Sequence, residues 1–207
     1  MQFIRPPFIY RKLFPELTWK MPATENILYL TFDDGPEETI TPWVLEVLYK
    51  YNVKATFFCI GENIKKNPGI YDMILEQGHA TGNHTYNHLN GWETDNETYF
   101  KNTGMAAGVC KSALFRPPYG KITFGQAREL GRQYRIVMWD VLSYDFDLTV
   151  SPEQCFRNVT GNTTPGSIIV FHDSLKASPN MKHALPLVLE HFLQKDFRFD
   201  VIPCQAS

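Results

Sequence analysis

Carboxylates and imidazoles that could bind a metal and move protons follow apolar runs in this sequence. Asp33 and Asp34 stand directly after the apolar run at residues 27–32. His84 and His88 are four residues apart, so both imidazoles would share one face if this segment turns helically. Asp34 and the two histidines form an O,N,N ligand set with open positions for water and substrate. That pattern is typical of a catalytic metal, not of a closed structural one.

This ligand set does not select a single metal. Zn²⁺ is the first expectation, and Co²⁺, Ni²⁺, Mn²⁺ or Fe²⁺ would accept the same donors. A non-haem iron oxygenase uses the same ligand types, so the set alone leaves the reaction open. Plainer interpretations also exist, because Asp-Gly-Pro is turn chemistry and an isolated pair of histidines is more often structural. If Asp34 binds the metal, Asp33 remains free to act as a base.

Two further segments carry candidate groups. Arg116 opens a rigid segment with two prolines, and its guanidinium beside a carboxylate would keep that carboxylate ionised and oriented. The backbone N–H of Tyr119 could then face a developing oxyanion. His172 ends a strongly apolar run and could act as a general acid or base, with Asp145 as a partner. The plainer interpretations are a stiff loop with a surface arginine and a buried structural histidine.

Short apolar runs alternate with helical patterns along the chain. The runs predict strands at residues 27–32, 54–60, 79–83, 113–116, 135–140, 167–172 and 197–202. The helical patterns span residues 41–51, 62–77, 94–111, 123–133, 152–161 and 181–194, with Thr41-Pro42 and Ser151-Pro152 as starting signals. This alternation predicts an α/β fold with a parallel sheet. In such folds the carboxyl ends of the strands form the site, where the candidate groups would meet.

The predicted strands could close into a short barrel or remain an open, doubly wound sheet. No GxGxxG and no P-loop is present, so a nucleotide-binding version has no support. The length of 207 residues predicts one domain over 1–207, with the catalytic barrel over 26–207. Residues 1–25 contain several aromatic residues and are expected to form a latch over the sheet or over one barrel end. A peripheral membrane patch is the alternative.

Composition excludes several classes of protein. With 20 Lys+Arg and 22 Asp+Glu, the net charge of −2 argues against a nucleic-acid binder. The apolar runs are shorter than the ~18 residues of a transmembrane helix. Prolines interrupt any signal-peptide core in residues 1–20, which predicts a cytoplasmic location and leaves a peripheral or cell-envelope location open. The four cysteines include no CxxC pair and are expected to be buried, reduced thiols.

Five segments together resemble the polysaccharide deacetylase family, the NodB-type domains of carbohydrate esterase family 4. The family motifs (T/S)FDDGP, H(S/T)xxH and RxP(Y/F) are matched at Thr31–Pro36, His84–His88 and Arg116–Tyr119, and the motifs DxxDW and LxH are partly kept, in the same order, at Ser143–Phe146 and Val170–His172. Two departures stand out: Phe146 where the family usually has tryptophan, and Val170 in place of leucine. The resemblance runs from about residue 27 to residue 202.

The resemblance implies a distorted (β/α)7-type barrel of parallel strands, with the site at their C-terminal ends. It also implies metal-dependent hydrolysis of an N-acetyl group on a sugar. By similarity, Asp34, His84 and His88 bind the metal, which is expected to be zinc. Asp33 is then the general base, and His172 protonates the leaving amine.

The remaining groups would assist this chemistry. Arg116 orients the base, the Tyr119 amide faces the oxyanion, and Asp145 tethers either Arg116 or His172. Tyr119, Trp92 and Phe146 are expected to contact substrate, and the Phe146 substitution predicts an altered acyl or substrate preference.

The substrate itself stays open. An N-acetylated polymer, oligomer or conjugate, similar to peptidoglycan or chitin, is the first candidate. A small non-sugar amide or cyclic imide is the second, and a narrow, closed pocket would favour it. A catalytically silent domain that binds a glycan or a partner is the third, although such a domain would be expected to lose the base or a ligand. The sequence does not predict the oligomeric state.

Overall fold

A curled sheet of parallel strands forms the centre of the protein, in a computed structural model that describes residues 3–204. The strands are β1 (Ile27–Asp33), β2 (Thr56–Cys59), β3 (Ala80–Asn83), β4 (Leu114–Phe115), β5 (Arg135–Ile136), β6 (Val141–Leu142), β7 (Ile168–His172) and β8 (Arg198–Phe199). Their order is β5-β4-β3-β2-β1-β7-β6, with β8 paired to the beginning of β1. The predicted α/β fold, a distorted barrel of parallel strands, is confirmed.

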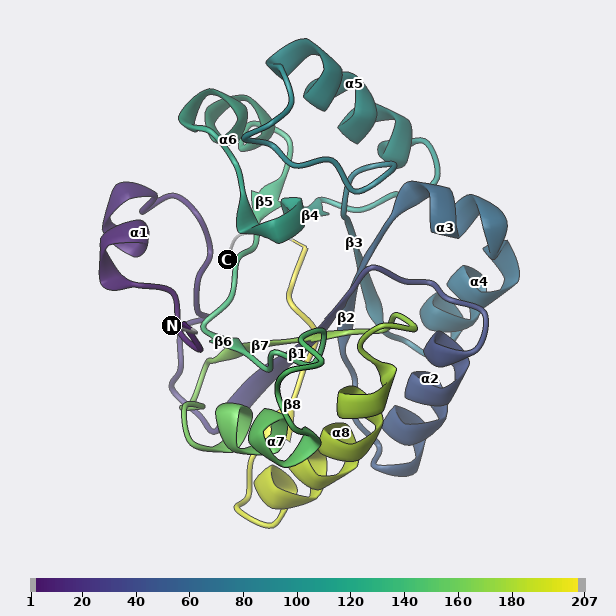
Figure 1. Cartoon of the computed structure of the whole chain (residues 1–207), viewed down its shortest axis with the longest axis vertical. Helices are drawn as coiled ribbons and strands as arrows, with labels where there is room; N and C mark the ends of the chain where they lie inside the picture. Colours follow the sequence, from purple (N-terminus) through teal and green to yellow (C-terminus); the bar gives the residue numbers. More distant parts are fainter. Residues whose placement is uncertain (1–2, 205–207) are drawn as a thin grey trace.

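Helices lie around the outside of this sheet (Figure 1). They are α1 (Phe8–Leu13), α2 (Ile40–Lys50), α3 (Gly61–Lys66), α4 (Pro68–Glu76), α5 (Asn96–Ala107), α6 (Phe124–Leu130), α7 (Pro152–Thr160) and α8 (Ser178–Leu193), with a short 3₁₀ turn, η1 (Pro118–Gly120). Each of the α-helices except α1 lies in a connection between parallel strands, as expected for a sheet buried on both faces, whereas the short link from β5 to β6 contains no helix.

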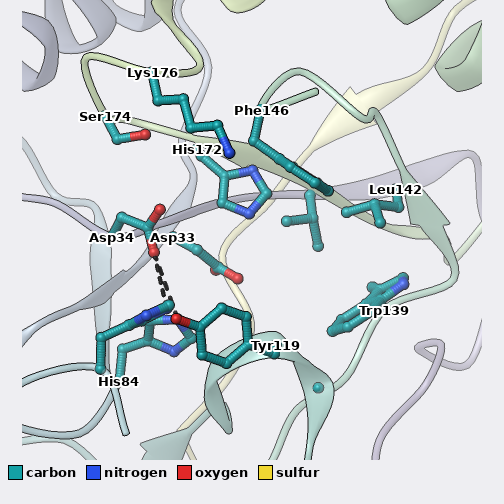
Figure 2. A pocket seen from close by; sticks show the side chains of 13 residues that line it. Asp33, Asp34, His84, Tyr119, Trp139, Leu142, Phe146, His172, Ser174 and Lys176 are labelled. Carbon is teal, nitrogen blue, oxygen red and sulfur yellow. Dashed lines mark ion pairs between the residues drawn. The ribbon is translucent and has the colours of Figure 1, made fainter. Parts of the chain in front are cut away.

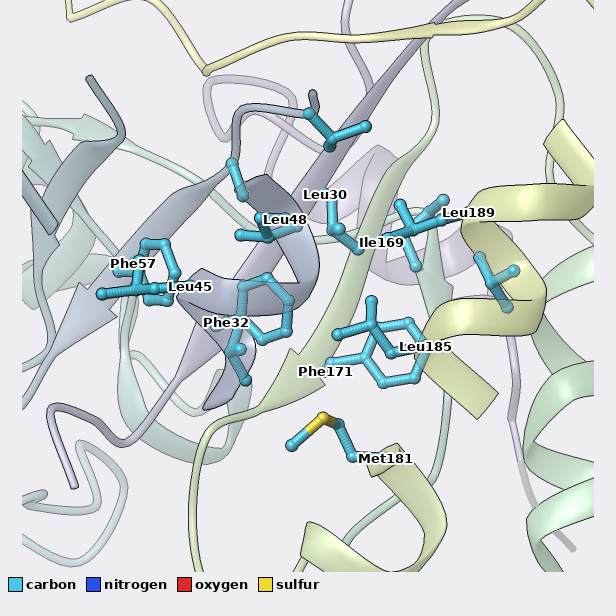
Figure 3. Packing of buried hydrophobic residues seen from close by; sticks show 14 of the residues in the cluster. Leu30, Phe32, Leu45, Leu48, Phe57, Ile169, Phe171, Met181, Leu185 and Leu189 are labelled. Carbon is cyan, nitrogen blue, oxygen red and sulfur yellow. The ribbon is translucent and has the colours of Figure 1, made fainter. Parts of the chain in front are cut away.

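The period of two along β1 divides its side chains between the outer helices and the barrel interior. Phe32 packs toward the helices, with its ring centroid 5.0 Å from that of Phe57 and 6.3 Å from that of Phe171 (Figure 3). Burial of each such ring contributes about 1.5–3 kcal/mol to folding. Thr31 and Asp33 therefore point the other way, into the barrel, where both reach the guanidinium of Arg116.

The strand predicted over residues 135–140 is present but too long, because β5 ends at Ile136 and β6 begins only at Val141. The N-terminal segment fills this seam: Thr18 forms a parallel bridge to Val137, and Lys20 forms an antiparallel bridge to Ser167.

Two arginines hold the same segment in place through one buried carboxylate. Arg5 and Arg11 both contact Asp140, at 2.8 Å and 2.5 Å. Asp140 also accepts a hydrogen bond from Ser167, which precedes β7. This carboxylate therefore lies away from the carboxyl ends of the strands and does not belong to the candidate site.

Two helix predictions are also wrong. The helix expected over 62–77 is broken at Asn67-Pro68, because proline lacks an N–H and its ring disfavours helical backbone at the preceding residue. Thr41 does not cap α2, because the helix begins one residue earlier, at Ile40. The hydroxyl of Thr41 instead donates a hydrogen bond to the carboxylate of Asp173. The Ser151 cap is confirmed, since its side chain accepts a hydrogen bond from the N–H of Gln154.

No helix within residues 3–204 is long and apolar enough to cross a membrane. Cys59, Cys110 and Cys155 are buried, free thiols, as expected. Cys204 is exposed, so the prediction of a buried thiol is wrong at that position.

Candidate active site

A pocket of about 560 Å³, called here the main pocket, opens where β1 and β7 end (Figure 2). Side chains from several separate loops reach into it. They are Asp33, Asp34, His84, His88, Tyr119, Trp139, Leu142, Phe146, Val170, His172, Ser174 and Lys176, with Gly120 contributing backbone. The structure therefore brings together most of the residues that sequence motifs had singled out.

Asp34, His84 and His88 form a compact cluster at one side of this pocket. Asp34 Oδ1 lies 3.3 Å from His88 Nε2 and 3.8 Å from His84 Nε2. One ligand atom from each residue lies within 4.8 Å of the other two. Asp34 Oδ1 is buried and has no hydrogen-bond partner among the described residues. A buried carboxylate oxygen that faces two imidazoles without a hydrogen bond fits a divalent cation with oxygen and nitrogen ligands.

The charge state of Asp34 is favourable for a metal ligand. Burial raises the pKa of this carboxyl, but contact with His88 and the charges of His172 and His84 outweigh burial and hold the pKa well below its usual range. The side chain is therefore an ionised carboxylate at neutral pH, as metal binding requires.

The orientation of His84 follows from its hydrogen bond. Its Nδ1 lies 2.8 Å from the carbonyl oxygen of Arg116, which can only accept, so Nδ1 carries the proton and donates. Burial lowers the pKa of His84 to about 4, so the ring is neutral at pH 7. The lone pair on Nε2 is then free and points toward Asp34, the arrangement of a histidine ligand held by a second bond.

The loop after β3 places the two histidines by an unexpected route. The helical turn that would have put both imidazoles on one face does not form, because the segment over 84–88 is irregular and both Thr85 (φ 63) and His88 (φ 61) adopt left-handed backbone. Such a conformation costs a non-glycine residue about 1–2 kcal/mol, so the surroundings must hold it. Asn83 and Asn102 do so by accepting hydrogen bonds from the N–H groups of Thr85 and Tyr86.

Asp33 is held by a fully buried arginine. Arg116 Nη1 donates to Asp33 Oδ1 at 2.6 Å and to Thr31 Oγ1 at 2.8 Å. Its other donors reach the carbonyls of Val137 and Met138, so the guanidinium is fixed from several sides. Oδ2 of Asp33 accepts no hydrogen bond from the described residues, and the side chain lines the main pocket. One oxygen is thus anchored, and the other is available to take a proton.

Asp145 pairs with His172. The sequence had left either Arg116 or His172 open as the partner of this aspartate. Asp145 Oδ1 lies 2.8 Å from His172 Nδ1, and Oδ2 accepts the backbone N–H of His172 at 2.7 Å. Burial lowers the pKa of His172, but the charge and hydrogen bond of Asp145, with the charges of Asp34 and Asp33, outweigh burial and raise it to about 9. His172 is therefore a protonated imidazolium at neutral pH, as a general acid must be.

The predicted substrate contacts divide into two groups. Phe146 lines the main pocket, with its ring centroid 4.9 Å from that of His172 in an edge-on arrangement. Tyr119 stands at the mouth and packs edge-on against His88 at 4.6 Å. Trp92 does not line the main pocket; it lies on an adjoining pocket and donates its indole N–H to the carbonyl of Ile122 at 3.1 Å.

Three residues at this site were missed as functional candidates from the sequence. Trp139 and Lys176 line the main pocket, and the ammonium of Lys176 lies 5.9 Å from the centre of the Phe146 ring. Asp173 accepts hydrogen bonds from the Thr41 hydroxyl (2.6 Å) and the Gly35 N–H (3.1 Å), and so supports the loop that carries Asp34. Burial raises the pKa of Asp173 to about 8. Its position directly after the strand-ending histidine was the available signal.

Comparisons with known proteins agree with this parallel barrel and its strand-end pocket. The sequence profile described as polysaccharide deacetylase matches residues 20–136. A peptidoglycan-N-acetylglucosamine deacetylase of Bacillus cereus is 34% identical over 191 residues, covering 88% of this chain and 89% of the relative. A chitooligosaccharide deacetylase of Azorhizobium caulinodans is 32% identical over 164 residues, covering 74% of this chain and 77% of the relative.

Similarity in three dimensions leads to the same family. The crystal structure of the Bc1960 peptidoglycan N-acetylglucosamine deacetylase matches with a TM-score of 0.86 at 33% identity, covering 95% of each chain. This chain belongs to the polysaccharide deacetylase family, the NodB-type domains of carbohydrate esterase family 4. The resemblance inferred from the five motifs is confirmed, and the relatives named here are carbohydrate deacetylases.

Proposed function

We propose that this protein is a metal-dependent hydrolase that removes N-acetyl groups from an N-acetylated sugar polymer, oligomer or conjugate. One observation carries the proposal. A single pocket holds an ionised carboxylate facing two imidazoles, a carboxylate with one free oxygen, and an imidazolium. A carboxylate oxygen that is free to take a proton and an imidazolium that can give one, both beside a cation site, are what amide hydrolysis requires.

Asp34, His84 and His88 would hold the cation, with zinc the first choice and cobalt, nickel, manganese or iron acceptable to the same donors. When bound, such a cation supplies polarisation of the acetamide carbonyl and a lower pKa for nearby water.

The chain's own residues would move the protons. Asp33 takes a proton from the attacking water at Oδ2, while Arg116 holds Oδ1 and keeps the carboxylate oriented. The water oxygen bonds to the acetyl carbon, and the backbone N–H of Tyr119, a residue that lines the pocket, would donate to the resulting oxyanion. His172 donates its Nε2 proton to the leaving nitrogen as the C–N bond breaks, giving acetate and a free amine.

The names of the relatives support an N-acetylglucosamine-type substrate, since they are described as peptidoglycan and chitooligosaccharide deacetylases. A narrow, closed pocket would have favoured a small amide or cyclic imide as the substrate. The main pocket instead continues into a second one that shares part of its lining. A silent binding domain has less support, because the base, the acid and all three cation ligands are present.

The test is acetate release by zinc-loaded protein on chitin oligomers, peptidoglycan fragments and small N-acetyl-sugar conjugates, with Asp33→Asn as the control. We expect release from at least one class of sugar substrate and its loss in the variant. Release that persists in Asp33→Asn would refute the assignment of the base. No release from any sugar by metal-loaded protein would refute the proposed deacetylase.

A further inference from the structure

We propose that the N-terminal segment binds this protein to an anionic lipid surface, through exposed apolar side chains on and beside helix α1. This surface, called here the N-terminal patch, consists of Phe3, Phe8, Ile9, Tyr10 and Leu13. Phe8 is 77% exposed and Ile9 is 56% exposed, and none of the six residues of α1 is buried. A single apolar side chain on a surface is ordinary, whereas several together mark a surface that a partner or a membrane covers.

The contact between Arg11 and Asp140 fixes which side of α1 faces outward. Because Asp140 is buried and Arg11 reaches it at 2.5 Å, the Arg11 side of the helix faces the barrel. Ile9 and Leu13 lie about 160° away from Arg11 around the helix axis, so both point away from the protein. Figure 1 shows α1 at the outer edge of the molecule. The apolar side of this helix is therefore presented to the surroundings.

The N-terminal segment already buries a separate set of apolar side chains. Leu17 is buried in a hydrophobic cluster, and Phe14 and Trp19 pack against the same cluster. The ring of Phe14 also stacks on that of Phe124, with 4.3 Å between the centroids. The segment is thus docked on the barrel by its own inward-facing residues. The outward-facing residues of the N-terminal patch are not needed for that docking and are available to another phase.

The distribution of charge favours an anionic lipid surface. Residues 1–20 contain four basic residues and one acidic residue, a net charge of +3. Because the whole chain has a net charge of −2, the remaining residues carry −5. Asp140 offsets part of this positive charge by pairing with Arg5 and Arg11. Lys12 is exposed on α1 and forms no ion pair with the described residues, so its ammonium can meet a lipid headgroup.

The placement of the patch residues fits a lipid phase better than a second protein. Phe8, Ile9 and Leu13 line neither the main pocket nor the adjoining pocket that Trp92 lines. They project from a helix instead of surrounding a cavity that could receive a partner's anchoring side chain. Projecting aromatic and aliphatic side chains next to a lysine are suited to the boundary between lipid headgroups and acyl chains, which requires no matching cavity.

The experiment is sedimentation of the full chain with vesicles of phosphatidylcholine, with and without phosphatidylglycerol. We expect binding to the anionic vesicles that weakens as salt is added. Phe8→Ser and Leu13→Ser should each lower the partition coefficient about 10-fold, and Lys12→Gln should lower it about 5-fold on anionic vesicles only. Tyr49→Ser is the matched control and should bind normally, because Tyr49 is also 77% exposed but lies on α2. Unchanged melting temperatures would show that the variants fold.

Two results would overturn the lipid-binding surface. One is a failure of the protein to sediment with anionic vesicles, and the other is an equal loss of binding in Phe8→Ser and Tyr49→Ser. A second copy of the chain is the alternative occupant of the patch. Dimers in analytical ultracentrifugation that Leu13→Ser abolishes, without vesicle binding, would assign the patch to self-association. Because the assay needs no acetate release, its outcome is separate from that of the proposed function.

Discussion

The substitution Asp145→Asn should lower the pH range of activity. We expect acetate release by the unmodified protein to persist into the alkaline range, and release by the variant to be lost above neutral pH. Asp145 is the main source of the raised pKa of His172: its charge and hydrogen bond, with the charges of Asp34 and Asp33, bring that pKa from 6.5 to about 9 against the opposing effect of burial. That difference corresponds to about 3 kcal/mol of extra stability for the protonated ring. Asparagine retains the shape and removes the charge, so the pKa of His172 should fall toward its ordinary value of 6.5.

The pH dependence follows from these two values. At pH 8, a general acid with a pKa of about 9 is about 90% protonated, whereas one with a pKa of 6.5 is about 3% protonated. The variant should therefore lose about 30-fold in turnover at pH 8 from this cause, and less than about twofold at pH 6. The stability of the folded state should also fall as the pH rises. Because the pKa of His172 is raised on folding, its contribution to stability is fully present below pH 6.5 and is lost as the pH rises through about 9.

Two measurements check this reasoning. Rates of acetate release between pH 5.5 and 9.5 should show the alkaline limb of the variant displaced to lower pH. An NMR titration of the imidazole should show the same displacement for His172. A loss of activity that is equally large at pH 6 and pH 8, or an imidazole that still titrates near 9 in Asp145→Asn, would refute the role given to this pair.

Three other substitutions test separate parts of the site. Asp33→Asn should keep the metal and lose about 10²- to 10⁴-fold in turnover, because an amide cannot take the water proton; metal analysis beside kinetics distinguishes the two effects. His84→Ala should lose metal after dialysis, and full metal content would show that this cluster is not the cation site. Gly35→Ala should destabilise the fold by about 1–3 kcal/mol, since its Cβ would lie 2.0 Å from the Asp173 carboxylate; an unchanged melting temperature would contradict this.

Most residues of the site could be predicted from the sequence, because they lie in short motifs at the ends of predicted strands. Asp33, Asp34 and His172 could be assigned to the pocket from the rule that parallel strands deliver their following residues to one edge. The family resemblance then added roles that residue types alone had left open.

Contacts between distant segments were harder to predict, because they depend on the packing of the whole barrel. The partner of Asp145 is set by how β6 and β7 bring residues 145 and 172 together, which no local pattern specifies. The left-handed backbone at Thr85 and His88 depends in part on a hydrogen bond that Asn102, a residue of α5, accepts from the backbone N–H of Tyr86. The break before Pro68, in contrast, was available from the sequence, since proline rules predict it directly.

The register of the sheet explains why the proposed base, Asp33, and the proposed acid, His172, lie beside each other. Asp33 and His172 are paired residues of the adjacent parallel strands β1 and β7, as are Phe32 and Phe171 one position earlier. Because side chains alternate along each strand, both polar residues face the pocket and both rings face the outer helices. A slip of one residue between these strands would turn a phenylalanine into the site and a charged group into the core. The apolar packing of Phe32 against Phe171 therefore fixes the spacing of the two groups that the chemistry needs.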